Sequence, residues 1–135
     1  MKIAAHIAAA LLGLAFVALG LMYLLGLVPD QPAPPEGSAV AHFMAAFAPT
    51  GYLTFVKVLE VVGGLLVALP PTRRSGLLVL GPILINILAF HVFVTGGEGV
   101  FSPVLMLLCA LALFLVWVER AAFARFVICR NERLP

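Results

Sequence analysis

The sequence predicts an all-α fold: a polytopic membrane bundle of four helices, with a short re-entrant or interfacial helix between the first two spans. Of the 135 residues, 64% are hydrophobic and 10% are charged, whereas a soluble domain is about 45–50% apolar and about 25% charged. The apolar residues also gather in runs close to the length of about 20 residues that a membrane-crossing helix needs. A soluble domain of this size could not bury so much apolar surface. We therefore expect one transmembrane domain in contact with a lipid bilayer.

The first span covers about residues 3–28, and we expect it to be retained. Lys2 gives it the positive start of a signal peptide, but the apolar core of a signal peptide runs about 7–15 residues before a small-residue cleavage site. This run is longer, and it ends in Val28-Pro29-Asp30 without an A-x-A sequence. A retained helix is therefore the better interpretation.

A proline-rich connector follows over residues 29–37, and proline-rich segments favour an extended backbone. Ser38 is a good N-cap for a short helix, so the sequence predicts a helical segment over about 38–48. This segment is too short to cross a bilayer. It is therefore expected to be interfacial or re-entrant.

Three further spans are expected at about 52–69, 77–95 and 101–118. Pro70-Pro71 ends the first of them, because proline cannot donate a helical hydrogen bond, and the GGEG sequence separates the other two. Trp117 lies near the end of the last span, where an interfacial indole ring is common. The tail over 119–135 combines four arginines with apolar residues, which predicts an amphipathic helix on the cytoplasmic membrane surface.

The charged loop residues predict the orientation of the chain. One side carries seven basic residues and the other none, the basic ones being Lys2, Arg73, Arg74, Arg120, Arg125, Arg130 and Arg133. The loops of the opposite side carry Asp30, Glu36 and Glu98. Because cytoplasmic loops are enriched in Lys and Arg, we expect both termini in the cytoplasm of a cell with a bacterial-type inner membrane.

Lys57 and Glu60 are the most informative polar residues, because both fall inside the second span. They are three residues apart and so share one helix face. A charge at the bilayer centre costs at least about 2.5–3.5 kcal/mol, so such residues usually face the bundle interior and pair with one another. Three interpretations stay open: a neutralised pair that fixes helix packing, a proton or ligand site in a polar cavity, or a lipid-facing placement without a role.

Asn86 and His91 fall at a similar depth in the third span, which runs back toward the outer side. Four polar side chains thus concentrate in the outer half of the bundle, and we predict a ligand pocket there, lined by Lys57, Glu60, Asn86 and His91. His91 and His42 form no recognisable metal motif, so no metal site is expected. No catalytic residue can be assigned.

Small residues and cysteines have simpler interpretations. Glu60, Gly64 and Ala68 share a helix face at a spacing of four residues, which allows another helix to approach closely. Cys109 and Cys129 lie far from any CxxC pattern, so neither a disulfide framework nor a cluster site is predicted.

The stretch FVKVLEVVGGLLVALPPTRRSGLLVL, residues 55–80, resembles the DoxX-like family of small membrane proteins. The preceding HFMAAFAPTGY, residues 42–52, is also similar to the corresponding segment of such proteins. The resemblance implies an integral bundle of four helices. The family is named for a small subunit associated with thiosulfate:quinone oxidation, and other members are linked to membrane redox complexes. In this sequence the resemblance highlights Lys57, Glu60, Gly63 and Gly64.

Three functions are compatible with these features. The first is a small membrane subunit of a quinone-linked redox system, with quinone as its cofactor, a redox protein as its partner, and Glu60 handling a proton. The second is a permease for protons or small solutes, which requires polar groups that continue to the cytoplasmic side. The third is a scaffold, whose polar cluster would be dry and fully satisfied. A homo-oligomer is compatible with all three, and the scattered basic residues form no nucleic-acid footprint.

Overall fold

The structure is a computed structural model that describes residues 1–128, with side chains described through Arg125. Every regular element within these residues is helical. In chain order the elements are α1 (Lys2–Leu24), α2 (Ala39–Phe47), the 3₁₀ helix η1 (Ala48–Thr50), α3 (Tyr52–Ala68), α4 (Arg73–Ala89), the π-helix η2 (Phe90–Val94) and α5 (Pro103–Ile128). The expected tail over 119–135 begins within α5, while residues 129–135, including Cys129, lie outside the described residues.

Helix α1 ends at Leu24, four residues earlier than the predicted apolar span. Gly26 adopts a left-handed conformation with φ of 67°. Its N–H donates to the carbonyl of Tyr23, and the N–H of Leu27 donates to that of Met22. This hydrogen-bond pattern is a Schellman motif, a common way for a helix to end when glycine follows the C-cap. The apolar run therefore continues past the point where the helix stops.

The second and third helices form a sharply bent pair. Ser38 Oγ accepts a hydrogen bond from the Ala41 N–H and so caps the start of α2. Gly51, with φ of 77°, then redirects the chain into α3. The segment Ala39–Thr50 is bent by 79° relative to Tyr52–Ala68. A glycine suits this position because the left-handed region is open to it at little steric cost.

A short turn joins α3 to α4. Thr72 Oγ1 donates to the carbonyl of Leu66 at 2.8 Å, and so satisfies one of the free carbonyls at the end of α3. Helix α4 begins at Arg73, four residues before the predicted start of the third span, so both arginines of the PTRRSG sequence belong to its first turn. Pro82 is accommodated inside α4, which ends in the π-helical turn η2.

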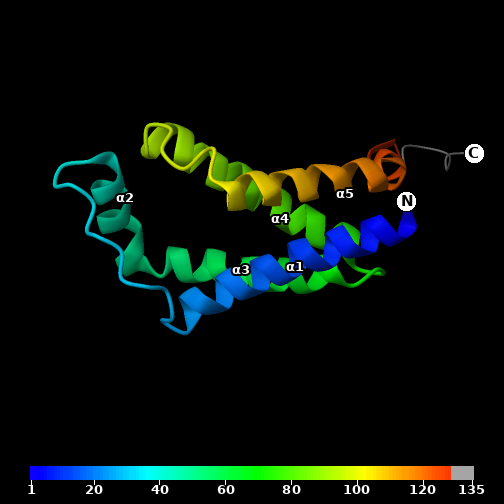
Figure 1. Ribbon diagram of the computed structural model, residues 1–135, viewed down its shortest axis with the longest axis horizontal. Coiled ribbons are helices and arrows are strands. Elements are labelled where there is room, and N and C mark those ends of the chain that lie inside the picture. The colour runs from blue at the N-terminus through cyan, green and yellow to red at the C-terminus, as the bar shows by residue number, and fades with distance from the viewer. Residues whose placement is uncertain (129–135) are drawn as a thin grey trace, which may run out of the picture.

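Helix α3 lies at the centre of the helix packing. It makes its most extensive contacts with α1 and α4, while α5 packs more lightly against α1 and α4. Figure 1 shows the N-terminus, the α3–α4 turn and the last turns of α5 at one end of the molecule, and α2 and η2 at the other. Phe16, Leu12, Leu80, Leu115 and Val67 are fully buried among these helices.

Glycines set how closely the helices pack. A Cβ on Gly64 would lie 2.8 Å from the carbonyl oxygen of Gly13, so α1 and α3 touch backbone to backbone at this crossing. A Cβ on Gly76 would meet the backbone of Val67, which fixes the close approach of α4 to α3. Gly63 faces Leu80 of α4. The consecutive glycines 63 and 64 therefore accommodate two different neighbouring helices.

Three helices in residues 1–128 are long and apolar enough to cross a membrane: Lys2–Leu24, Arg73–Val94 and Pro103–Arg125. The number rises to four if the bent pair of α2–η1 and α3 counts as one span. Only 17% of the apolar window of α5 is buried inside the chain, so most of its surface has no protein partner within one copy. Helices with such exposed apolar faces are typical of membrane proteins.

Candidate functional site

Lys57 and Glu60 form an ion pair on α3. Lys57 Nζ donates to both carboxylate oxygens of Glu60 at 2.9 Å. The Glu60 side chain is 3% exposed, whereas the Lys57 side chain is 27% exposed. The carboxylate is therefore sealed inside the helix packing, while the ammonium reaches toward its surface.

The burial of Glu60 follows from the small residues that come after it. Gly63 and Gly64 lie three and four residues further along the helix, on the same face as Glu60. Gly64 contacts α1 and Gly63 contacts α4, so both neighbouring helices approach α3 closely one turn beyond the carboxylate. Their approach leaves no room for water over this face, and Glu60 is 2% exposed as a whole residue.

Tyr23 of α1 completes the surroundings of Lys57. Its ring centroid lies 5.9 Å from Lys57 Nζ, within the range of a cation–π interaction. The approach depends on Gly20, because a Cβ there would lie 3.1 Å from the Lys57 carbonyl oxygen. Tyr23 falls inside the predicted first span, and the sequence gives no signal that its ring faces Lys57.

Within residues 1–125, neither Asn86 nor His91 makes a side-chain hydrogen bond or ion pair with Lys57 or Glu60. Asn86 lies on an exposed face of α4. His91, in η2, donates its Nδ1–H to the Glu98 carbonyl oxygen at 2.8 Å, since a carbonyl can only accept. Thr95 Oγ1 donates to the carbonyls of both His91 and Glu98. His91 thus anchors the GGEG loop, and the ligand-binding role of the four residues stays a prediction.

Aromatic side chains connect α2 to the adjoining helix ends. The ring of Phe43 packs 4.9 Å from that of Phe90 and 4.7 Å from that of Phe47, measured between centroids. The ring of Phe47 in turn lies 5.0 Å from that of Tyr52. The Phe43–Phe90 pair is edge-to-face, an arrangement that adds about 0.5–1.5 kcal/mol beyond its buried area. These contacts hold α2 against η2 and the start of α3.

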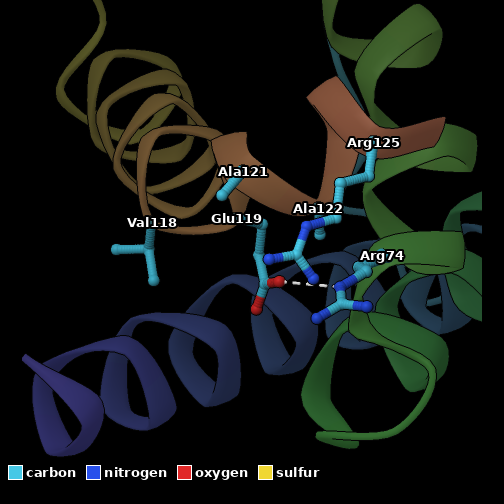
Figure 2. A pocket seen from close by; sticks show the side chains of 6 residues that line it. All are labelled: Arg74, Val118, Glu119, Ala121, Ala122 and Arg125. Atoms are coloured by element: carbon cyan, nitrogen blue, oxygen red, sulfur yellow. Dashed lines mark hydrogen bonds and ion pairs between the residues drawn. The ribbon is translucent and has the colours of Figure 1, made fainter. Parts of the chain in front are cut away.

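A second ionic cluster lies at the opposite end of the molecule, and sequence reasoning did not identify it. Arg74 Nε donates to Glu119 Oε2 at 2.8 Å, and Arg73 Nη1 lies 3.9 Å from Glu119 Oε1. Arg73 is 5% exposed, although the sequence interpretation placed it in a loop. Figure 2 shows the cavity of about 300 Å³ beside this cluster, with Arg125 at its wall. Glu119, an acid among the basic residues of this end, is the one feature of the sequence that could have indicated this cluster.

Metal-binding geometry is not found in the part of the chain that the structure describes, where no group of three or more His, Cys, Asp or Glu side chains converges. A small all-helical protein with apolar helices of membrane-crossing length and two ionic clusters is thus the class that the fold and the sites define. Comparison with models of known protein families, with curated protein sequences and with solved structures gives no match.

Proposed function

We propose that the chain is a DoxX-like protein with four membrane-spanning helices arranged as a bundle, the bent pair supplying one of them as a span with a re-entrant segment. The arrangement of charges supports an orientation with both termini in the cytoplasm of a bacterial-type cell. Lys2, Arg73 and Arg74 lie at the end where α1 begins and α3 meets α4, and Asp30, Glu36 and Glu98 lie in the loops of the other end (Figure 1).

We further propose that the Lys57–Glu60 pair binds the head group of a quinone, and that the protein is a small membrane subunit of a quinone-linked redox system. The supporting observation is the asymmetry of the pair. An ammonium has three donors, and both acceptors of Lys57 within residues 1–125 are on Glu60. One donor is left for a ligand, and the partly exposed lysine is accessible from outside the helix packing.

A quinone suits this donor for chemical reasons. Its carbonyl oxygen accepts a hydrogen bond, and its apolar ring and tail dissolve in lipid. Glu60 fixes the position of the ammonium, and the Tyr23 ring lies beside it. In this proposal the chain supplies binding and orientation, while electrons come from a redox partner protein.

A structural role for the pair is the second candidate. It is supported by the geometry of Glu60, because both carboxylate oxygens are satisfied by Lys57 at 2.9 Å and the residue is sealed from solvent. A pair that neutralises itself in this way needs no ligand. The two candidates differ in whether the remaining lysine donor is used.

Quinone retention by purified protein distinguishes the candidates. The protein is purified in mild detergent and extracted with organic solvent, and the quinone recovered per mole of protein is measured by chromatography with absorbance detection. We expect wild-type protein to retain quinone and the Lys57→Met, Glu60→Gln double variant to retain about tenfold less, since a hydrogen bond to a charged donor contributes about 1.5–3 kcal/mol. The double variant removes both charges and so avoids a stranded carboxylate.

The matched control is Lys2→Met, which removes an exposed lysine at the far end of α1. It should retain as much quinone as the wild type. Absence of quinone from the wild-type protein, or equal retention by the folded double variant, would overturn the quinone proposal and favour the structural role.

A further inference from the structure

A cavity between the start of α4 and the last turns of α5 is lined by basic and small apolar side chains around one acid, Glu119. Its volume is about 300 Å³, and its walls are formed by Arg74, Val118, Glu119, Ala121, Ala122 and Arg125. Figure 2 shows Arg125 extending from the last turns of α5 toward the Arg74–Glu119 ion pair. The small residues of α5 leave the space that these long side chains border.

Positive charge exceeds negative charge around this cavity. Glu119 is the acid that pairs with both Arg73 and Arg74, and Arg125 adds a third guanidinium at the wall. No acidic side chain in residues 1–125 lies within ion-pair distance of Arg125. The cluster thus holds three guanidinium groups against one carboxylate.

Arg73 has buried hydrogen-bond donors that the surrounding protein does not satisfy. Its side chain is 6% exposed, and Nε and Nη2 have no hydrogen-bond partner among the described residues. Its Nη1 lies 3.9 Å from Glu119 Oε1, too far for a hydrogen bond. A buried, unsatisfied guanidinium costs free energy unless an anion or water meets it. The cluster of Arg73, Arg74 and Glu119 is therefore short of acceptor oxygens, and Arg73 lies behind the residues that line the cavity rather than among them.

The cavity also lies at a level where a membrane surface is expected. Trp117 and Arg120 lie on the same turns of α5 as its lining residues, with the Arg120 guanidinium 4.4 Å from the Trp117 ring centroid. The Trp117 side chain is exposed, and exposed indole rings collect at the head-group level of membranes. Basic pockets between helices at this level are suited to acidic lipid head groups.

We infer that this cavity binds a phosphate group through Arg74 and Arg125, with Arg73 supplying further positive charge. The guanidinium fork matches the spacing of two phosphate oxygens and binds them in pairs. The phosphate of an anionic phospholipid and free inorganic phosphate share this chemistry. The inference does not depend on the Lys57–Glu60 site, which lies near the middle of α3.

Binding is tested on the full-length protein in detergent by native mass spectrometry, with phosphatidylglycerol and inorganic phosphate as separate probes. Arg125→Gln should weaken binding of the effective probe about tenfold, which corresponds to about 1.4 kcal/mol. Arg120→Gln is the matched control, since it removes an arginine of the same helix that is engaged with Trp117 instead. It should leave binding within about twofold of the wild type.

Glu119→Gln gives a readout that a purely structural ion pair would not give. Removing the carboxylate frees Arg74 and removes a competing anion, so phosphate binding should become tighter. If phosphatidylglycerol binds and excess inorganic phosphate does not displace it, the bound phosphate group belongs to a lipid. If only inorganic phosphate binds, the ligand is a soluble phosphate. The inference is overturned if neither probe binds, if Arg120→Gln weakens binding as much as Arg125→Gln, or if Glu119→Gln weakens it.

Discussion

The Lys57–Glu60 pair makes an unequal prediction for its two single substitutions. Lys57→Met leaves a carboxylate whose side chain is 3% exposed without its partner, and stranding a buried charge costs about 3–5 kcal/mol. Glu60→Gln leaves an ammonium that is 27% exposed and can extend toward the surface, so we expect a loss of about 1–2 kcal/mol. The lysine substitution should be the more damaging one.

The double variant should cost far less than the two losses added together. With both charges removed no group is stranded, and replacing a buried pair by uncharged residues is often close to neutral, about 1 kcal/mol or less here. The single substitutions sum to about 5 kcal/mol, so the coupling energy should be about 4 kcal/mol. This coupling energy is well above the deviations from additivity that substitutions at independent sites show.

The free energy of unfolding is measured for all four members of the cycle. Each protein is unfolded reversibly in mixed micelles of a mild detergent and sodium dodecyl sulfate, with circular dichroism as the signal. A matched cycle with Lys2→Met and Glu98→Gln, both exposed and at opposite ends of the molecule, should be additive. A coupling energy within about 0.5 kcal/mol of zero for the Lys57–Glu60 cycle, the additivity expected of distant sites, would refute the reasoning.

Three further predictions concern orientation and packing. A cysteine replacing Glu98 in a cysteine-free background should react with an impermeant thiol reagent added outside intact cells; reaction only after lysis would reverse the proposed orientation. Gly76→Leu should destabilise the α3–α4 contact by about 1–3 kcal/mol in the same unfolding assay, because the added side chain meets backbone. Gly81→Ala, with open space at its Cβ, should be neutral or stabilising. Equal losses of stability in Gly76→Leu and Gly81→Ala would contradict the close α3–α4 contact at Gly76. Phe43→Ala should increase hydrogen exchange in α2 about fivefold or more by removing the contact with Phe90, and unchanged exchange would contradict that contact.

Local features of the fold could be predicted from the sequence because they depend on nearby residues. Ser38 marks the start of α2 since a capping side chain bonds to a backbone N–H three residues ahead. The spacing of Lys57 and Glu60 predicts that they share a face for the same reason, and the ion pair is present. Gly64 indicates a close helix contact, although the sequence does not say that Gly13 is opposite.

The sequence could not predict which way a helix face points in the bundle, or which residues far apart in the chain lie in contact. The sequence predicts how far along the third span Asn86 lies. Because α4 is apolar on nearly every side, the pattern does not predict which face of the helix carries Asn86. The π-helical turn then shifts the position of His91, and its imidazole bonds to the Glu98 carbonyl. Arg74 and Glu119 are 45 residues apart, and only the packing of α4 near α5 brings them together.

The placement of both members of the ion pair on one helix has a consequence for biosynthesis. Residues three apart meet as soon as the helix forms, so Lys57 can neutralise Glu60 before α1 or α4 has packed against α3. In the proposed membrane bundle, α3 thus carries no net charge from this pair, whichever neighbouring helix packs first. The Arg74–Glu119 pair forms later, because Glu119 belongs to α5, the last of these helices to be synthesised. Arg73 and Arg74 therefore gain this acidic partner only once α5 is made.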